Sequence, residues 1–267
     1  MDVFAGERAE LRRLCSKFVA DDVARQVFEI AAPAMRIEPG GSGRSRFGGP
    51  GLLDAGVDWP EWNGIPLTLL AVLDLAELPG PDVLPREGVL NVFHYDPDLP
   101  SDVEWPYPDF GDGCAVLLSH QGQEVPAPER ATAFVPQNVR FEPVLTLPDR
   151  FHQAWKPLRI AGGYGDSDHL FARLADGLDD LIDEWGETHK SCHQLGGWPA
   201  AIHNDPREDA VMARGPADWR LLLQLITDGR MLTTEGHQSW SWADCGYAYF
   251  MLPRPAAWED TALITQG

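Results

Sequence analysis

Basic residues are scarce in this chain. Its 267 residues include 21 lysines and arginines against 41 aspartates and glutamates, which gives a formal net charge of −20 at pH 7. Nucleic acids and anionic membranes are bound through basic surfaces, so the sequence predicts neither a nucleic-acid nor a membrane partner. The acidity fits either an ordinary solvated surface or attraction to a positively charged partner.

Cysteines and long apolar runs are also few. The four cysteines lie far apart without a C-x-x-C pair, and they are Cys15, Cys114, Cys192 and Cys245. No apolar run approaches the roughly 18 residues of a membrane-spanning helix. The first residues lack the charged and then apolar pattern of a signal peptide. We therefore expect a soluble cytoplasmic protein with reduced cysteines and no cofactor.

The distribution of apolar residues predicts a mainly β, α+β fold: a roll of antiparallel sheets with two flanking helices. Three- and four-residue steps predict helices near residues 7–31 and 167–185, with Pro33 stopping the first and Gly186 ending the second. The 26 glycines and 23 prolines favour short elements joined by turns. Short apolar runs predict strands at 68–75, 89–95, 115–119, 139–147, 221–226 and 246–252.

Three motifs occur twice in the same order and at similar spacing. The first copies span residues 47–50, 64–70 and 88–93, and the second copies span 195–199, 219–225 and 246–250. Two copies are too few for a solenoid, so we expect the copies to pack on each other as one pseudo-symmetric core. The predicted organisation is a single domain over 1–267, with a helical segment at 1–33, a first half at 44–147 and a second half at 166–252.

At these motifs the chain resembles the YwqG-like bacterial family, a group carried as a domain of unknown function. The matching segments are 45–50, Trp59-Pro60, 64–67, 88–90, 193–199, 219–225 and 242–246. The resemblance implies a β-rich α+β roll with flanking helices, and no established activity, cofactor or catalytic residue. It also implies two departures: Val72 stands where a Gln is usual, although its counterpart Gln224 is kept, and His203 replaces another Gln. If the family's polar cluster binds a ligand, the ligand or its affinity differs here.

The first Gly-Gly corner is a candidate anion site. Gly48 and Gly49 permit positive φ, so their amides can cradle an anion, with Arg44 and Arg46 beside them. The alternative is a tight turn where two backbones pack. No nucleotide-binding glycine motif is present. A small-molecule sensor would use Arg44, Arg46 and Gln224.

A histidine- and cysteine-containing segment is a weak candidate for a metal site. His189, Cys192 and His193 carry competent zinc ligands, as do His203 and Asp205 further along. The flanking glycines favour a loop over the helix that two histidines four residues apart would need. The alternative for His193 is to satisfy backbone groups in the corner that it precedes.

Asp244 lies beside Trp242 at the start of a predicted strand. In aromatic surroundings its carboxyl can act as a general acid or base, and His193 or Asp205 would complete a catalytic group. The alternative is a turn in which the carboxylate accepts backbone amides. No G-x-S-x-G motif is present.

These patterns together predict a binding protein. Tryptophans in expected loops fit either a recognition surface or lids over the core, and they are Trp59, Trp62, Trp105, Trp198, Trp240, Trp242 and Trp258. The predicted partner is a basic protein, neutralised as immunity proteins neutralise toxins, or a small ligand. Predicted ligand-binding residues are Arg44, Arg46, Gly48, Gly49, Gln224, Trp242 and His203. The alternative is a hydrolase using His193, Asp205 and Asp244 with His203, with or without a metal. No particular oligomeric state is predicted.

Overall fold

One large antiparallel sheet organises the chain. The computed structural model describes residues 2–79, 84–95, 111–160, 172–189, 192–237 and 240–267. Ten strands form the sheet in the order β14-β13-β12-β11-β1-β10-β2-β6-β7-β8, and β3-β9 and β4-β5 are separate pairs. The strands are β1 Ala32–Pro39, β2 Arg46–Phe47, β3 Gly51–Leu53, β4 Glu61–Trp62, β5 Ile65–Pro66, β6 Thr68–Asp74, β7 Val89–His94, β8 Cys114–Ser119, β9 Gln123–Val125, β10 Gln137–Thr146, β11 His193–Gly196, β12 Arg220–Ile226, β13 Tyr247–Leu252 and β14 Ala262–Gln266.

The sheet nearly closes on itself. Its outermost strands β8 and β14 approach each other, because Leu263 N donates to Gly111 O at 3.1 Å and Cys114 Sγ donates to Thr261 O at 3.5 Å. The prediction of a mainly β, α+β fold is confirmed. All six predicted strands are present, with ends that differ by one or two residues.

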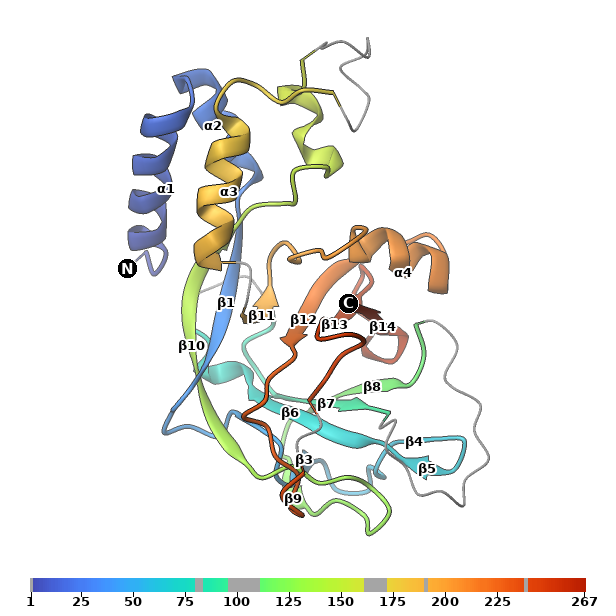
Figure 1. The fold of residues 1–267 in the computed structure, drawn as a ribbon. Helices are drawn as coiled ribbons and strands as arrows, with labels where there is room; N and C mark the ends of the chain where they lie inside the picture. The colour runs from blue at the N-terminus through green and yellow to red at the C-terminus, as the bar shows by residue number, and fades with distance from the viewer. Residues whose placement is uncertain (1, 80–83, 96–110, 161–171, 190–191, 238–239) are drawn as a thin grey trace.

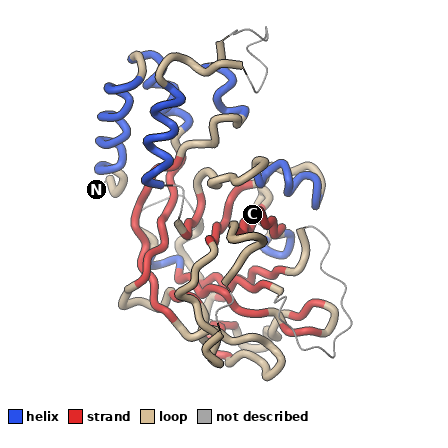
Figure 2. The backbone as a smooth tube through the Cα atoms, in the orientation of Figure 1, coloured by secondary structure: helices blue, strands red, loops and turns tan. Residues whose placement is uncertain are grey.

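Three helices gather at one end of the long β1–β10 pair, while the fourth packs against β13 and β14 (Figure 1). The helices are α1 Ala5–Phe18, α2 Asp21–Ile30, α3 Leu178–His189 and α4 Pro206–Arg214, with single-turn helices at Leu75–Glu77, Gln153–Leu158 and Trp258–Asp260. In Figure 2 the helices α1, α2 and α3 lie beyond the region where most of the strands are gathered. The helix expected over 7–31 is therefore two helices, with an acidic first turn at the start of α2.

The helix predicted over 167–185 is shifted along the chain. Residues 172–177 are not helical, because Ala175 N donates to Leu158 O at 2.8 Å and Leu174 forms a bridge with Arg159; residues 161–171 lie outside the described part. Gly186 does not end the helix. Trp185 donates from Nε1 to Leu145 O at 3.1 Å, and such packing outweighs the roughly 1 kcal/mol that a helical glycine costs.

The strand order is matched on the two sides of the central β1–β10 pair. Outward from β10 the order is β2-β6-β7-β8, and outward from β1 it is β11-β12-β13-β14. Phe47 pairs with Ala71 on one side, as Leu195 pairs with Leu223 on the other. The β6–β7 pair has a bulge between Leu69 and Ala71, and the β12–β13 pair has one between Leu221 and Leu223. This correspondence supports the predicted duplication.

The core has three parts. One apolar cluster joins the helices to both halves, a second lies within the first half around Phe93, and a third lies within the second half around Tyr249. Each half therefore has its own small core, and the largest cluster connects them. Among the described helices, none is long and apolar enough to cross a membrane.

Candidate functional site

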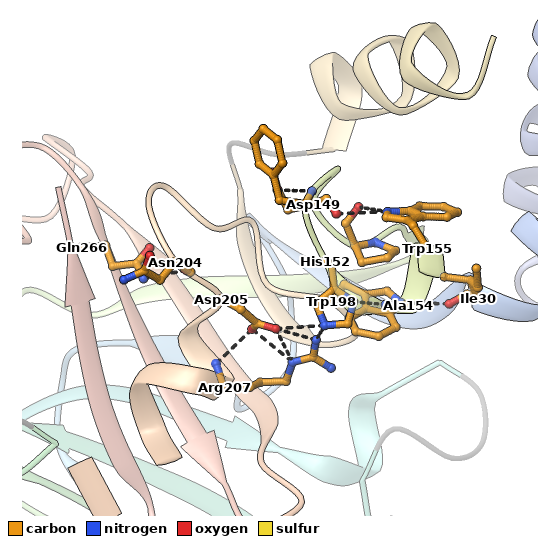
Figure 3. A network of polar contacts seen from close by, with 12 residues as sticks. Ile30, Asp149, His152, Ala154, Trp155, Trp198, Asn204, Asp205, Arg207 and Gln266 are labelled. Carbon is orange, nitrogen blue, oxygen red and sulfur yellow. Dashed lines mark hydrogen bonds and ion pairs between the residues drawn. The ribbon is translucent and has the colours of Figure 1, made fainter. Parts of the chain in front are cut away.

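A cavity of about 230 Å³ lies where the segment after β10 meets the segment after β11. The first segment contributes Asp149, Phe151 and His152, and the second contributes Trp198 and residues up to Glu208. Trp198 is fixed from two sides, because its backbone N donates to Thr146 Oγ1 at 2.8 Å. Its Nε1 also donates to Ile30 O at 2.9 Å (Figure 3). The indole that follows the second Gly-Gly corner thus forms a rigid wall.

Asp205 connects the polar groups of this cavity. It is the N-cap of α4, accepting from Arg207 N at 3.0 Å. Its Oδ2 lies 2.7 Å from Arg207 Nη2 and 3.0 Å from His152 Nε2. His152 Nδ1 accepts from Ala154 N at 2.8 Å, which places the proton of the neutral ring on Nε2, facing Asp205. Figure 3 shows these side chains pointing toward one another.

The guanidinium of Arg207 lies over the Trp198 ring, with Cζ 4.3 Å from the ring centroid. The His152 ring packs against the same indole at 4.7 Å between centroids, and Arg207 Nη2 also lies against His152 Nε2. Burial opposes ionisation of Asp205, but the hydrogen bond from His152 and the charge of Arg207 outweigh it, so the pKa of Asp205 is lowered. The carboxylate is therefore ionised at neutral pH.

The described lining of the cavity is acidic and offers no hydroxyl, thiol or amine nucleophile. Its charged lining comprises Asp149, Asp205 and Glu208 against Arg207. Of its described lining residues none is Ser, Thr, Cys or Lys. Both ring nitrogens of His152 are engaged by protein groups. The arrangement suits recognition of a positively charged group better than covalent catalysis.

His193 lies elsewhere, at the seam of the two halves. Its side chain is buried; Nδ1 accepts from Ile226 N at 3.2 Å and Nε2 is 3.2 Å from Asp228 Oδ2. Its ring packs on Phe47 at 4.9 Å between centroids. Hydrogen bonds from His193 and Arg230 lower the pKa of Asp228, so His193 faces a carboxylate there. This geometry fits a structural histidine that forms hydrogen bonds with buried neighbouring groups, here Ile226 N and Asp228.

Gln224 is fully buried, and its side-chain amide forms hydrogen bonds with backbone groups. Its Oε1 accepts from Ala200 N at 2.9 Å, and its Nε2 donates to Cys192 O at 3.1 Å. In the first half Val72 occupies the corresponding position, and Asn91 of the next strand acts instead: Leu52 N donates to Asn91 Oδ1 and Asn91 Nδ2 donates to Leu52 O, both at 2.8 Å. The side chain of Asn91 therefore makes, in the first half, backbone hydrogen bonds of the kind that Gln224 makes in the second half.

The first Gly-Gly corner uses its amides internally. Gly48 N donates to Leu70 O at 2.8 Å and Gly49 N donates to Phe134 O at 3.0 Å. The buried Arg46 wraps around the corner, donating from Nη1 to Arg44 O at 3.0 Å and from Nη2 to Pro50 O. The exposed Arg44 is 3.6 Å from Asp74. This geometry favours the tight turn over the anion site.

The described metal candidates do not form a metal site. In the part of the chain that the structure describes, no group of three or more His, Cys, Asp or Glu side chains is placed to hold an ion. The His189 side chain lies outside that part. Cys192 is half-buried, and burial raises its pKa. His203 lines the cavity with Asp205, and its Nε2 is 3.1 Å from Gly267 O.

Asp244 and Trp242 belong to a turn closed by a bond from Gly246 N to Trp242 O at 2.7 Å. Asp244 is exposed, and no hydrogen bond or ion pair between described residues joins it to His193 or Asp205. Trp242 is buried and donates from Nε1 to Ile226 O at 3.1 Å. Of the predicted site residues, only His203 and Asp205 share the cavity.

Four residues of the cavity were not predicted from the sequence: His152, Arg207, Asp149 and Glu208. One signal was available: Asp205 followed by Pro206 is typical of a helix N-cap and first position, and it would have placed Arg207 and Glu208 in a first helical turn. No local pattern identified His152 or Asp149, because they reach the cavity only through tertiary contact.

The fold defines a mainly β protein with a nearly closed sheet built from two matched sets of strands. Residues 45–257 match the family described as Domain of unknown function (DUF1963). This match covers most of the chain, and the chain therefore belongs to that family. None of the curated proteins matches the sequence significantly.

Proposed function

We propose that this chain is a non-enzymatic binding protein that recognises a positively charged side chain of a protein partner in the cavity beside Trp198. The observation that carries the proposal is the composition of the cavity, in which aromatic rings stand beside uncompensated carboxylates. Within its family we place the chain with the YwqG-like bacterial proteins. We further propose that it acts in the cytoplasm, without nucleic acid, membrane or cofactor.

A lysine or arginine side chain fits this lining. Carboxylates pair with the charged end, and aromatic faces attract it, contributing about 0.5–2 kcal/mol depending on desolvation. Asp149 and Glu208 are the acidic groups without an ion-pair partner among the described residues, whereas Asp205 is held by Arg207 and His152. Phe151 supplies an exposed ring at the same cavity.

Exposed apolar side chains near the cavity favour a protein as the partner. Phe151 is 48% exposed, and on α4 Met212 is 71% exposed and Val211 39%. Positions 208, 211 and 212 lie on one face of a helix, so these two side chains continue from Glu208 along the surface. Together with the net charge of −20, this supports a basic protein partner that is attracted electrostatically. Neutralisation of such a partner is the version we favour.

The hydrolase alternative needs His193, His203, Asp205 and Asp244 in one place. The positions of these residues do not support it, because His193 is buried at the seam and Asp244 is exposed on a separate turn. A binding role needs no such convergence.

The test is calorimetric titration with acetyl-Ala-Lys-Ala-amide, and with the norleucine analogue, which lacks the charge. Replacing Asp149→Asn together with Glu208→Gln should weaken binding of the lysine peptide by about tenfold, roughly 1.4 kcal/mol. Asn keeps the acceptor that Asp149 offers to Phe151 N at 2.9 Å. The matched control replaces the exposed Asp58→Asn and Glu129→Gln and should change binding less than about twofold. Equal losses in both variants, or equal binding of the norleucine peptide, would contradict the proposal.

A further inference from the structure

A second and larger hollow lies next to the cavity. This groove has a volume of about 630 Å³, and Trp198 and Arg207 line both hollows, so their stack forms a shared wall. The groove extends from there to the start of β12 and to the segment that follows β13. Its volume lies within the roughly 300–1,000 Å³ of pockets that hold small molecules.

The groove has the opposite charge to the cavity. Arg207, Arg220 and Arg254 line it from three separate elements, and the only acidic residue in its described lining is Asp218. This is an unusual concentration of arginine in a chain with 41 acidic and 21 basic residues. Concave surfaces lined by one sign of charge concentrate ligands of the other sign.

Two of these arginines can engage a ligand. Arg254 is exposed and has no ion-pair partner among the described residues. Arg220 lies 3.1 Å from Asp218, but both side chains are about half exposed, 48% and 60%, and such surface pairs contribute about 1 kcal/mol or less. A ligand anion can therefore replace Asp218 as the partner of Arg220 with little loss of free energy. Arg207 is held by Asp205 and keeps the shared wall in place.

Three tryptophans stand among the apolar residues that line the groove. Trp219 is buried and anchored by its Nε1, which donates to Gly215 O at 3.0 Å, and Trp258 is half-buried. With Trp198 these rings come from three separate segments. The backbone of the second corner, at Gly196 and Gly197, also lines the groove. Rigid rings of this kind bind flat apolar groups at low entropic cost.

From this geometry we infer that the groove is a binding site for a small organic anion. The apolar body of the ligand packs against Trp198, Trp219 and Trp258, and its carboxylate or phosphate pairs with Arg254 and Arg220. Arginine suits both head groups, because its planar fork donates two parallel hydrogen bonds to either. The two hollows share the Trp198–Arg207 wall, but this site differs from the proposed cation cavity in ligand charge, in the rest of its lining and in its test.

The experiment uses three probes with one apolar body: 1-naphthoate, 1-naphthyl phosphate and the neutral 1-naphthalenemethanol. Binding to the full-length protein is measured by calorimetry. We expect the charged probes to bind at least tenfold more tightly than the neutral one, and the ratio of the two charged probes identifies the preferred head group. Arg254→Gln and Arg220→Gln should each weaken the charged probes about five- to tenfold, while the neutral probe is unchanged.

Arg130→Gln is the matched control, because Arg130 is exposed on a loop outside the groove and loses the same charge. It should alter binding of the charged probes less than about twofold. The inference is overturned if no probe binds at millimolar concentration, if the neutral probe binds as tightly as the anions, or if the control variant loses as much affinity as Arg254→Gln. Asp149→Asn with Glu208→Gln should leave all three probes unaffected, which separates this site from the cavity.

Discussion

Asn91 and Gln224 each hold the segment that follows a Gly-Gly corner. Asn91 binds both the backbone N and O of Leu52, whereas in the second half Gln224 binds Ala200 N and Tyr249 OH donates to Ala200 O at 2.7 Å. Replacing Asn91→Leu leaves the two Leu52 groups without this partner in a buried site. Each such group costs about 1–3 kcal/mol, so we expect a loss of about 2–6 kcal/mol in the free energy of unfolding.

Chemical denaturation measures this loss, and Gln224→Leu should cause a comparable one. Asn138→Leu is the control, because Asn138 is exposed and its change should cost less than about 0.5 kcal/mol. Similar stability of the Asn91 and Asn138 variants would contradict a structural role for the buried amide.

The family resemblance matched Val72 with Gln224, and the strand registers agree, but it did not predict how the first half manages without a glutamine. Periodicity reports which face of a strand is buried, and not which neighbouring strand reaches a given amide. That depends on register, which here shifts at a bulge between Leu69 and Ala71. Gln224 was predicted as a ligand contact, but its amide oxygen and nitrogen each bond to a backbone group, of Ala200 and Cys192.

Helix α4 depends on Asp205 both as an N-cap and as an ionic partner, and two substitutions separate these roles. Asp205→Asn keeps the acceptor for Arg207 N but removes the charge that faces Arg207 and His152. Asp205→Ala removes both, and should destabilise the protein by about 1 kcal/mol more than Asn, as other N-caps do.

The pH dependence gives a second check. The folded pKa of Asp205 is lowered, so its ionic contribution is complete above the unfolded pKa of about 3.9 and is lost as the pH falls through the folded value. The stability gap between the native protein and Asp205→Asn should therefore be constant near neutral pH and shrink below about pH 4. A gap that persists unchanged at pH 2–3 would show that the charge contributes nothing. Urea denaturation across this range is the measurement.

Long apolar runs made the inner strands predictable, because burial on both faces leaves a continuous signal. The short strands and β14 were not predicted, and three other missed elements show different reasons. β1 contains Pro33, which was interpreted only as a helix stop, and β11 is short and ends in the second Gly-Gly corner. The N-cap signal of α4 was interpreted as a ligand at Asp205. The cavity itself joins segments around 148–152 and 198–208, about 50 residues apart, and only the sheet order brings them together.

Each of the two Gly-Gly corners packs closely against a neighbouring segment of the fold. All four glycines have positive φ, between 64° and 77°. A Cβ on Gly48 would lie 2.7 Å from Phe134 Cβ and 3.0 Å from Phe134 O. A Cβ on Gly197 would lie 2.5 Å from Thr146 Oγ1 and 2.7 Å from Ala34 Cβ, within the central β1–β10 pair. Alanine at either corner therefore meets both an unfavourable φ and a packed neighbour.

Gly56 supplies the matched control, since its φ is +84° but nothing lies within 4 Å of its Cβ position. Gly56→Ala should cost about 1–2 kcal/mol from the left-handed backbone alone. Gly48→Ala and Gly197→Ala should each cost about 1–3 kcal/mol more, because overpacking is added. If the corners are equivalent parts of a duplicated unit, the two losses should agree within about 1 kcal/mol in denaturant titrations. A corner substitution that costs no more than Gly56→Ala would mean that the halves are not held together at these positions.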